Sequence, residues 1–387
     1  MATPKLKILI TGSNGFVAKN IILSLEEKND FDLVFYNRSN SFDQLEKLII
    51  TSDFIIHLAG ENRPKNEIDF YNVNQGLTKS ICEIAKYSKK NIPIIFFSSI
   101  QAKLDNSYGK SKKKGEELII KYNKETGNKV YIYRPNGIFG KWCKPNYNSV
   151  VATFCNNIAN NLPIKISDES NLLNIVYIDD IVKFVIKDLK DHFNSIDIKK
   201  SKNEVIWVEV EPVYQITLGN LSKKIKSFRD SRTSLIIDNV GTGLDRALYS
   251  TYLTYLPKDK FSYEVKSHSD ERGVFVEMLK TQDSGQFSFF TAYPGITRGG
   301  HYHHSKTEKF LVIQGDARYR FRNLDTNEFL EINTKEDKNL IVETIPGWSH
   351  DITNVGKNNL IVMLWANEIF NPSEPDTFLS EVCNEET

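Results

Sequence analysis

The chain has 387 residues, which is enough for two domains with separate hydrophobic cores. Its 50 lysine and arginine residues balance 49 aspartate and glutamate residues, so no net charge draws it to nucleic acid or to a membrane surface. The sequence has no run of about 18 apolar residues, and its apolar start is too short for a signal peptide. Four scattered cysteines without CxxC spacing are typical of a reducing compartment. We expect a cytoplasmic protein with no nucleic-acid or membrane partner.

Residues 5 to about 190 alternate short apolar segments with stretches of helical spacing. The predicted strands cover residues 7–10, 31–36, 53–58, 92–97 and 129–133. Helical spacing is found in residues 17–27, 40–50 and 74–87. Because continuously apolar strands alternate with helices, we expect a doubly wound parallel sheet of the Rossmann type, covered on both faces.

A glycine-rich turn lies where the first predicted strand meets the first helix. Gly12, Gly15 and Ala18 form it. Glycine lets the backbone approach a pyrophosphate, and the N-terminus of the helix then faces that group. The turn therefore predicts a dinucleotide cofactor.

The second predicted strand ends in Asn37 and Arg38. Chains that bind NAD usually place an acidic residue here, where it meets the ribose 2′-hydroxyl. A guanidinium suits a 2′-phosphate instead, so we favour NADPH. A solvated surface arginine is the alternative interpretation.

Two hydroxyl-bearing residues and a lysine follow the fourth predicted strand. Ser99 comes at the strand end, and Tyr108 and Lys112 lie four residues apart, on one face of a predicted helix. A cationic lysine lowers the pKa of a neighbouring phenol, which makes Tyr108 a usable proton donor or acceptor. Ser99 could then hold the substrate oxygen. The arrangement predicts a catalytic set for reducing or oxidising a carbonyl.

Residues 5 to about 250 resemble the extended short-chain dehydrogenase/reductase family. Further landmarks of that family are matched by residues 57–60, 134–136 and 176–180. The resemblance implies a catalytic set of Ser99, Tyr108 and Lys112. It implies cofactor contacts at Gly12, Asn14, Gly15, Phe16, Val17, Arg38, Leu58, Ala59, Tyr108, Lys112 and Arg134.

Two departures from that family pattern concern the turn and the catalytic loop. Ala18 replaces the third glycine, and only eight residues separate Ser99 from Tyr108. Sugar-nucleotide dehydratases of the family carry an Asp-Glu pair where this chain has Ile100 and Gln101. Without these acids, elimination of water is disfavoured and reduction of a ketone is favoured.

From about residue 257 the pattern changes to short segments with alternating apolar residues. Predicted strands cover residues 261–265, 273–278, 287–291, 317–322 and 360–365, which indicates an all-β barrel or sandwich. A helical stretch over residues 244–256 followed by a proline marks the predicted junction. We therefore expect a reductase domain over residues 1–256 and a β domain over residues 257–387.

The β domain carries a predicted metal site. His301 and His303 point to one face of a strand, Glu308 follows after a turn, and His350 comes from a later strand. Three imidazoles and a carboxylate suit Zn²⁺ or another divalent metal with an open coordination position. Histidines on the surface of an ordinary barrel are the alternative, and the metal could be catalytic or structural.

The spacing of these residues resembles the two cupin motifs. Residues 295–315 match G(x)5HxH(x)4E(x)6G, whereas the second motif, PxGxxHxxxN, is one residue short at Pro346 and Gly347. The resemblance implies a cupin β-barrel, a fold that some sugar-nucleotide epimerases use. Such an enzyme removes a proton next to a ketone, and the base could be any of the metal-site residues or Tyr302.

Over residues 5 to about 382 the chain resembles the CapF-like family of bifunctional UDP-sugar epimerase/reductases. The matching segments are residues 98–102, 108–112, 140–148, 256–263 and the segment around His301. The resemblance implies C3 epimerisation of a UDP-2-acetamido-2,6-dideoxy-4-keto-L-hexose by the cupin, followed by C4 reduction with NADPH. The implied product is a UDP-N-acetyl-6-deoxy-L-hexosamine of the L-talose or L-rhamnose type, on the route to UDP-L-FucNAc or UDP-L-QuiNAc.

The same resemblance implies a homodimer, with a 4,6-dehydratase upstream and a 2-epimerase downstream in the pathway. Two other interpretations stay open at this point. The chain could be a C4 reductase only, whose cupin is a metal-braced dimerisation module. It could also be a non-catalytic regulator that binds NADPH, although an intact Ser99, Tyr108 and Lys112 set argues against this.

Overall fold

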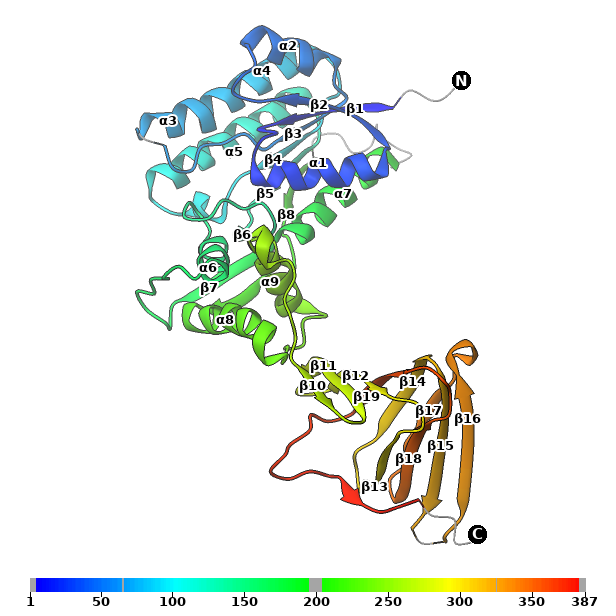
Figure 1. The fold of residues 1–387 in the computed structure, drawn as a ribbon. Helices are drawn as coiled ribbons and strands as arrows, with labels where there is room; N and C mark the ends of the chain where they lie inside the picture. Colours follow the sequence, from blue (N-terminus) through cyan, green and yellow to red (C-terminus); the bar gives the residue numbers. More distant parts are fainter. Residues whose placement is uncertain (1–4, 65, 195–203, 325, 383–387) are drawn as a thin grey trace. The chain divides into compact units, whose positions relative to one another are not determined.

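A computed structural model describes residues 5–64, 66–194, 204–324 and 326–382 (Figure 1). The chain divides into two compact units, Met1–Lys223 with Ser250–Tyr255, and Lys224–Tyr249 with Leu256–Thr387. The chain passes from the first unit to the second for the last time between Tyr255 and Leu256, one residue before the expected boundary at residues 256 and 257. The second unit also takes in a stretch before that crossing, so the functional boundary stays a prediction.

The first unit is built on a six-stranded sheet in which every strand pair is parallel. Its strand order is β2 (Phe31–Tyr36), β1 (Leu6–Thr11), β3 (Phe54–His57), β4 (Ile94–Phe97), β5 (Val130–Tyr133) and β8 (Val205–Val208). Residues of β3, β4 and β5 are all buried, as expected for strands covered on both faces. The five strands predicted for this unit are confirmed.

Helices cover both faces of this sheet (Figure 1). On one face lie α1 (Phe16–Lys28) and α7 (Ile178–Asn194), which contact each other. On the other face lie α2 (Phe42–Thr51), α4 (Thr78–Tyr87) and α5 (Ser107–Thr126), packed on a core that includes Leu9, Ile55 and Ile132. The predicted doubly wound architecture is confirmed. Because all strands are parallel, their carboxyl ends meet at one edge, where ligands bind in such folds.

Local signals decide where α5 begins. The side chain of Asn106 accepts a hydrogen bond from the Gly109 N–H at 2.7 Å and caps the helix. A side chain at Gly109 would collide with the carbonyl oxygen of Gln101, in the short helix η2 (Ile100–Lys103). This close contact seats the first turn of α5, and therefore Tyr108, against the end of β4.

Smaller elements complete the first unit and lead into the second. A three-stranded sheet contains β6 (Gly137–Phe139), β7 (Leu172–Tyr177) and β9 (Tyr214–Thr217). The helical elements are α3 (Ile68–Tyr71), η1 (Asn72–Leu77), α6 (Val150–Ala159), α8 (Leu218–Ser234), α9 (Gly243–Leu253) and η3 (Lys258–Lys260). Across the described residues, no helix is long and apolar enough to cross a bilayer.

The second unit is a β-barrel of two antiparallel sheets. One has the order β10 (Ser267–Asp270), β11 (Gly273–Thr281), β12 (Gly285–Ala292), β19 (Leu360–Ala366), β14 (Glu308–Gln314) and β17 (Ile341–Glu343). The other has the order β16 (Phe329–Lys335), β15 (Asp316–Asn323), β18 (Trp348–Asn354), β13 (Thr297–Tyr302) and β20 (Phe378–Leu379). Phe290, Phe310 and Phe321 belong to the core between them. The predicted cupin barrel is confirmed.

One predicted strand of this unit is wrong. Residues 261–265 form no strand, and the first strand begins only at Ser267. Phe261 and Tyr263 are 72% and 50% exposed, so their alternation does not reflect burial on one face of a sheet. Instead the guanidinium of Arg232 lies 4.2 Å from the centre of the Tyr263 ring.

Two candidate active sites

A cavity of about 660 Å³ opens in the first unit beside the glycine-rich turn. Gly12 has φ +69° and donates its N–H to the Tyr36 carbonyl at 2.8 Å. A Cβ at Gly12 would lie 2.8 Å from the backbone of Ala59, so only glycine fits this position. Gly15 stands at the N-terminus of α1 without a capping side chain. Free helix N–H groups beside a cavity of this size suit a dinucleotide pyrophosphate.

The predicted cofactor residues fall into two groups. Those that line the cavity are Gly12, Asn14, Gly15, Arg38, Leu58 and Ala59. Those that do not line it are Phe16, Val17, Tyr108, Lys112 and Arg134. The cavity is completed by residues outside the predicted cofactor set, namely Tyr36, Asn37, Ser39, Gly60, Asn72, Val73 and Leu77.

Arg38 is held at the rim of the cavity by an acidic residue. Its guanidinium forms an ion pair with Glu61, whose side chain is only 13% exposed although that of Arg38 is 82% exposed. The N–H of Glu61 donates to Asn74 Oδ1 at 2.8 Å, and the Asn74 amide donates to the Glu61 carbonyl at 2.9 Å. Glu61 is thereby fixed at its backbone while its carboxylate anchors an exposed cation.

Tyr108 and Ser99 lie together as predicted. The Tyr108 side chain is partly buried and lies beside the Ser99 side chain. Burial raises the pKa of the Tyr108 phenol above its usual range, and the polar Ser99 side chain opposes this more weakly. The expectation that a nearby lysine lowers this pKa is therefore wrong for the chain by itself, because burial outweighs the other effects.

Lys112 is a buried cation beneath the cavity. Its ammonium donates to the Phe97 carbonyl at 2.9 Å, and a Cβ at Gly60 would lie 2.9 Å from Nζ. Burial lowers the pKa of Lys112 to about 8, although the charge of Glu116 opposes this. Burial and the charge of Lys112 together lower the pKa of His57 to about 3, so this imidazole is neutral. Lys112 thus lies between the end of β4 and a cavity-lining residue.

Arg134 is occupied elsewhere. Its guanidinium donates to both carboxylate oxygens of buried Glu116 at 2.6 and 2.7 Å, and it lies 4.2 Å from the Trp207 ring centre. Glu116 also accepts a hydrogen bond from Ser98 at 2.5 Å. Arg134 lines a separate cavity of about 300 Å³ beside β8. A cofactor contact at Arg134 stays a prediction, which this ion pair does not favour.

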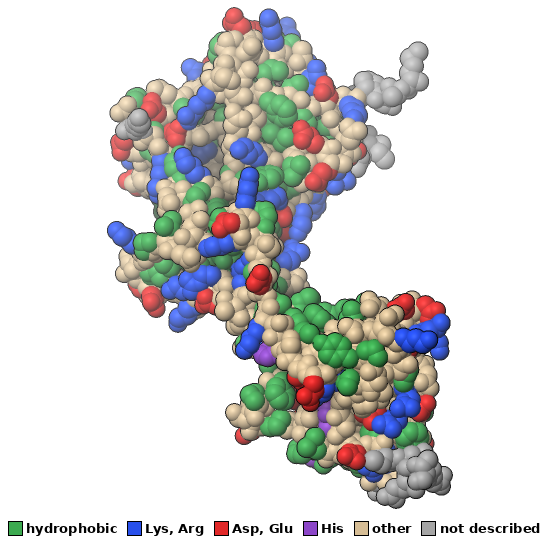
Figure 2. Space-filling model, viewed as in Figure 1, with side chains coloured by type: hydrophobic (Ala, Val, Ile, Leu, Met, Phe, Trp, Pro, Cys, Tyr) green, Lys and Arg blue, Asp and Glu red, His purple; other side chains and the backbone are tan. Residues whose placement is uncertain are grey.

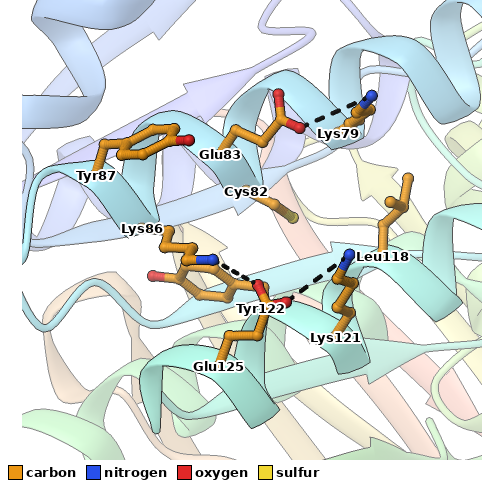
Figure 3. A pocket seen from close by; sticks show the side chains of 9 residues that line it. All are labelled: Lys79, Cys82, Glu83, Lys86, Tyr87, Leu118, Lys121, Tyr122 and Glu125. Carbon is orange, nitrogen blue, oxygen red and sulfur yellow. Dashed lines mark hydrogen bonds and ion pairs between the residues drawn. The ribbon is translucent and has the colours of Figure 1, made fainter.

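A third cavity, of about 150 Å³, lies between α4 and α5 (Figure 3). Its charged groups pair with one another, as in the 3.0 Å ion pair between Lys86 and Glu125. Burial raises the pKa of the Cys82 thiol to about 12, and Glu83 adds to this, so no thiolate nucleophile forms here. This cavity offers no group for chemistry.

The four predicted metal ligands come together in the second unit. His301 belongs to β13, Glu308 begins β14 and His350 lies in β18, where it pairs with His301 across the two strands. One potential ligand atom from each of these residues and from His303 lies within 4.8 Å of all the others. His304, outside the motif, packs instead against the Phe378 ring at 4.8 Å between ring centres.

The electrostatics of this cluster suit a divalent cation. Burial opposes ionisation of Glu308, but the neighbouring imidazoles of His303 and His350 and the charge of Lys306 hold the pKa of its carboxyl well below the usual range. Burial and His350 lower the pKa of His301 to about 4, which leaves a neutral imidazole. The buried Nε2 of His350 lies 3.5 Å from Glu308 Oε2 but makes no hydrogen bond to any of the described residues. A buried acceptor left without a donor fits a metal ligand.

Sequence reading missed the residues that hold these sites in place. Asn74 is fully buried in η1, an unusual π-helical turn, and its amide also donates to Ser111 at 2.9 Å. Lys306 is 7% exposed, and its ammonium lies 3.7 Å from Glu308 Oε1. Asp376, far along the chain, contacts the loop that carries His303. No spacing rule predicts such contacts, because each joins residues distant in sequence or on irregular backbone.

Two regions of the chain match known protein families. Residues 8–198 match the NAD dependent epimerase/dehydratase family, and residues 268–378 match the polysaccharide biosynthesis C-terminal domain. A solved UDP-glucuronic acid 4-epimerase from Bacillus cereus is 19% identical with a TM-score of 0.50, and it covers 58% of this chain and 84% of that one. This last likeness shows the fold of the first unit alone.

Two relatives match almost the whole chain. The UDP-2-acetamido-2,6-beta-L-arabino-hexul-4-ose reductase of Pseudomonas aeruginosa is 51% identical over 97% of this chain and 99% of that protein. The solved capsular polysaccharide assembling protein CapF from Staphylococcus aureus is 40% identical with a TM-score of 0.87, over 97% of this chain and 100% of that one. The chain therefore belongs to the CapF-like family, in which an extended short-chain dehydrogenase/reductase domain precedes a cupin domain.

Proposed function

We propose that the chain is an NADPH-dependent UDP-4-keto-sugar reductase whose cupin unit epimerises C3 of the same sugar. The observation that carries the reductase part is the proximity of Tyr108 and Ser99 at the carboxyl end of the sheet that also forms the cofactor cavity. The substrate class follows the named activity of the Pseudomonas relative, which is 51% identical. It is a UDP-2-acetamido-2,6-dideoxy-4-keto-L-hexose.

In the reductase site the chain handles the proton and the orientation of the ketone. NADPH, when bound, supplies the hydride that reaches C4. Tyr108 donates its phenolic proton to the C4 oxygen as the alcohol forms, and Ser99 holds that oxygen by its hydroxyl. The raised pKa of Tyr108 keeps the phenol protonated and ready to donate. Lys112 supplies a positive charge near this proton, and solvent restores the proton afterwards.

In the cupin unit His301, His303, Glu308 and His350 would hold a divalent cation, for which zinc suits the donor set. Such a cation supplies Lewis-acid stabilisation of an oxygen anion. C3 epimerisation needs a base that removes the C3 proton, and the histidines of the cluster and Tyr302 are the candidates. The 4-keto group acidifies C3, so epimerisation must precede reduction.

The product is a UDP-N-acetyl-6-deoxy-L-hexosamine of the L-talose or L-rhamnose type. A 4,6-dehydratase must supply such a 4-keto substrate, and a 2-epimerase would carry the product on to UDP-L-FucNAc or UDP-L-QuiNAc. Preference for NADPH is supported by the exposed guanidinium of Arg38 at the cavity rim. Its donors not used by Glu61 can meet a 2′-phosphate.

A homodimer is supported by the outer face of the larger cupin sheet. Phe287 and Trp365 face each other across β12 and β19, as do Phe289 and Met363, and Leu311 neighbours Met363 on β14. These side chains alternate with the buried core residues, so they lie on the outer face and stay partly exposed. Figure 2 shows hydrophobic side chains gathered over this part of the unit. A second copy is the occupant we propose.

Exchange with D2O tests the central proposal. The 4-keto substrate incubated without NADPH should gain deuterium at C3, and added NADPH should then give a product whose C3 and C4 configurations are read by NMR. A substrate that gains no deuterium would support the reductase-only interpretation. A chain that consumes no NADPH with this substrate would support the regulator interpretation.

A further inference from the structure

The segment that follows β19 contacts the loop that carries His303 and leads into Glu308. We call this segment, residues 367–382, the C-terminal strap. At its start the Thr307 N–H donates to Asn367 Oδ1 at 2.9 Å. Near its end β20 pairs with β13, opposite His301 and Tyr302. The strap is therefore fastened on both sides of the connection between β13 and β14.

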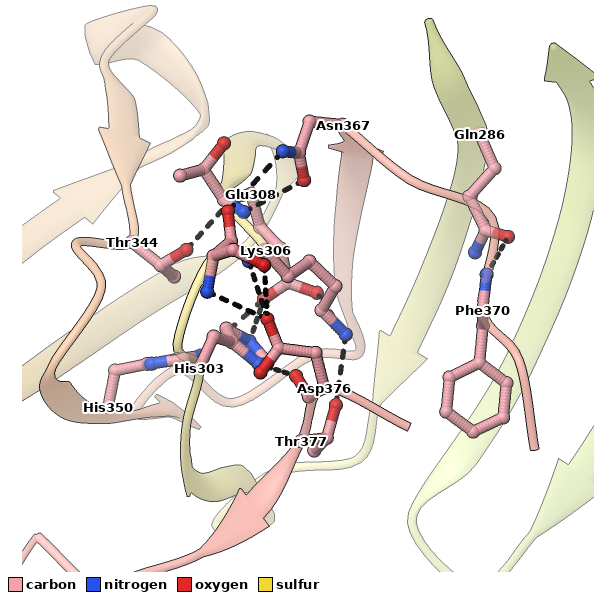
Figure 4. A network of polar contacts seen from close by, with 12 residues as sticks. Gln286, His303, Lys306, Glu308, Thr344, His350, Asn367, Phe370, Asp376 and Thr377 are labelled. Atoms are coloured by element: carbon pink, nitrogen blue, oxygen red, sulfur yellow. Dashed lines mark hydrogen bonds and ion pairs between the residues drawn. The ribbon is translucent and has the colours of Figure 1, made fainter. Parts of the chain in front are cut away.

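Asp376 lies in the middle of the strap, and its carboxylate binds three successive backbone groups of that connection (Figure 4). The N–H groups of His304, Ser305 and Lys306 each donate to it at 2.8 Å. The Ser305 hydroxyl adds a fourth hydrogen bond at 3.0 Å. Burial opposes ionisation of Asp376, but these donors hold the pKa of its carboxyl well below the usual range. Such charge-assisted hydrogen bonds to consecutive N–H groups fix the path of a loop.

The backbone of Asp376 acts on a metal ligand directly. The His303 Nδ1–H donates to the Asp376 carbonyl at 2.6 Å. This hydrogen bond places the proton on Nδ1 and leaves Nε2, which lies 3.3 Å from Glu308 Oε2, with its free electron pair toward the cluster. A ligand histidine is commonly oriented by a backbone carbonyl in this manner.

The next residue of the strap reaches a second ligand through a cation. Lys306 donates to the Thr377 hydroxyl at 3.0 Å, and the same ammonium lies 3.7 Å from Glu308 Oε1. Figure 4 shows Lys306, Glu308 and His303 converging between the strap and the barrel wall. Two adjacent strap residues therefore act on both His303 and Glu308.

We propose that Asp376 is a positioning residue of the metal site, which holds the 303–307 loop so that His303 and Glu308 present their ligand atoms together. The inference rests on the metal site of the proposed function, but it does not depend on the cupin being an epimerase. Loss of the Asp376 carboxylate would leave all four ligands in the chain. It would remove the hydrogen bonds that hold the loop between His303 and Glu308 in place.

The test measures metal binding by the full-length chain. Zn²⁺ affinity is determined by competition with a chromophoric chelator, and the geometry of the site by the visible absorption bands of bound Co²⁺. The variants are Asp376→Asn, which keeps the shape and loses the charge, and Asp376→Ala. Glu374→Gln is the matched control, because it removes an exposed strap carboxylate two residues away. Ser305→Ala removes one of the four hydrogen bonds and provides a graded variant.

We expect both Asp376 variants to bind Zn²⁺ about 10- to 100-fold more weakly, with shifted Co²⁺ bands. Ser305→Ala should lose less affinity, and Glu374→Gln none. Circular dichroism and NADPH binding report on the folding of each variant. Should Asp376→Ala fail to fold, the isosteric Asn variant still decides the question.

Zn²⁺ affinity of Asp376→Asn within twofold of the unchanged chain would overturn the proposal. Weaker binding with unchanged Co²⁺ bands would also overturn it, because a purely structural role lowers affinity without altering ligand geometry. An unchanged chain that binds neither metal would instead overturn the metal assignment made under Proposed function, which separates the two failures.

Discussion

The two candidate sites differ in what their buried polar atoms contact. At the reductase site Lys112 donates to the Phe97 carbonyl, and Thr11 and Thr78 hydrogen bond both nitrogens of His57. In the cupin unit the ligand atoms face mainly one another, and His350 Nε2 lies 3.5 Å from Glu308 Oε2 without a hydrogen bond to any described residue. Hydrogen-bonded groups suit a site that binds and releases an exchangeable cofactor, whereas ligand atoms that face one another suit a resident cation.

The largest expected effect tests whether the two sites act separately. Tyr108→Phe removes the proton donor and should lower the rate of NADPH oxidation on the order of 10²- to 10⁴-fold. Deuterium incorporation at C3 should stay unchanged, because the cupin ligands are untouched. Both rates are measured on the same preparation, one by absorbance and one by NMR. A parallel loss of C3 exchange would show that the sites are not independent.

The reverse variant removes a ligand on the cupin side. His301→Ala should lower Zn²⁺ affinity by more than the ~10- to 100-fold expected of residues that only position ligands. It should also abolish C3 exchange if the cupin is an epimerase. Metal content after dialysis and NMR of the substrate are the measurements. Intact C3 exchange in a metal-free His301→Ala chain would assign epimerisation to another group or protein.

The pH dependence of NADPH oxidation tests the reductase site separately from the cupin site. Burial lowers the pKa of Lys112 to about 8, so its positive charge is present below that pH and lost as the pH rises through it. NADPH oxidation should therefore fall about tenfold per pH unit above ~8 if this charge assists proton transfer. Lys112→Arg keeps its charge at alkaline pH and should move the fall upward. If the rate of NADPH oxidation fell at the same pH in Lys112→Arg, titration of Lys112 would be excluded as the cause of the fall.

The lowered pKa of Lys112 also makes the free energy of unfolding depend on pH. Since the folded pKa of Lys112 lies below the unfolded value of 10.5, the unfolded chain binds more protons between pH 8 and 10.5. This group therefore adds stability as the pH rises through that window, opposite to the loss expected for activity. Denaturant unfolding across these pH values would separate the two effects.

The smallest effect concerns the rim of the cofactor cavity. Glu61→Gln removes the charge that anchors Arg38 and should weaken NADPH binding about two- to fivefold, as expected for an exposed ion pair. Binding of NADH should not change. Glu67→Gln, an exposed acid in the same region, is the control. Calorimetric titration with both cofactors is the measurement, and tighter NADPH binding in Glu61→Gln would show that Glu61 repels the 2′-phosphate.

Pattern recognition worked where function depends on regular spacing. Alternation predicted that His301 and His303 act together, and they do, although β13 ends at Tyr302 and His303 lies in the loop just beyond it. Helical spacing placed Tyr108 and Lys112 on one side of α5. It failed for residues 261–265, whose apolar alternation comes from exposed side chains. It also missed β8, which reaches the sheet edge only by pairing with β5.

Local periodicity and motif spacing were sufficient for the layer order of the first unit, the barrel of the second and the identities of the groups that carry chemistry. Only the tertiary structure determined which residues contact these groups. Glu61 meets Arg38, Glu116 meets Arg134, and Asp376 meets His303 because distant segments pack together. The direction of the Tyr108 pKa shift was decided in the same way. Burial is a property of the packed chain, and it outweighs the neighbours that a sequence motif can name.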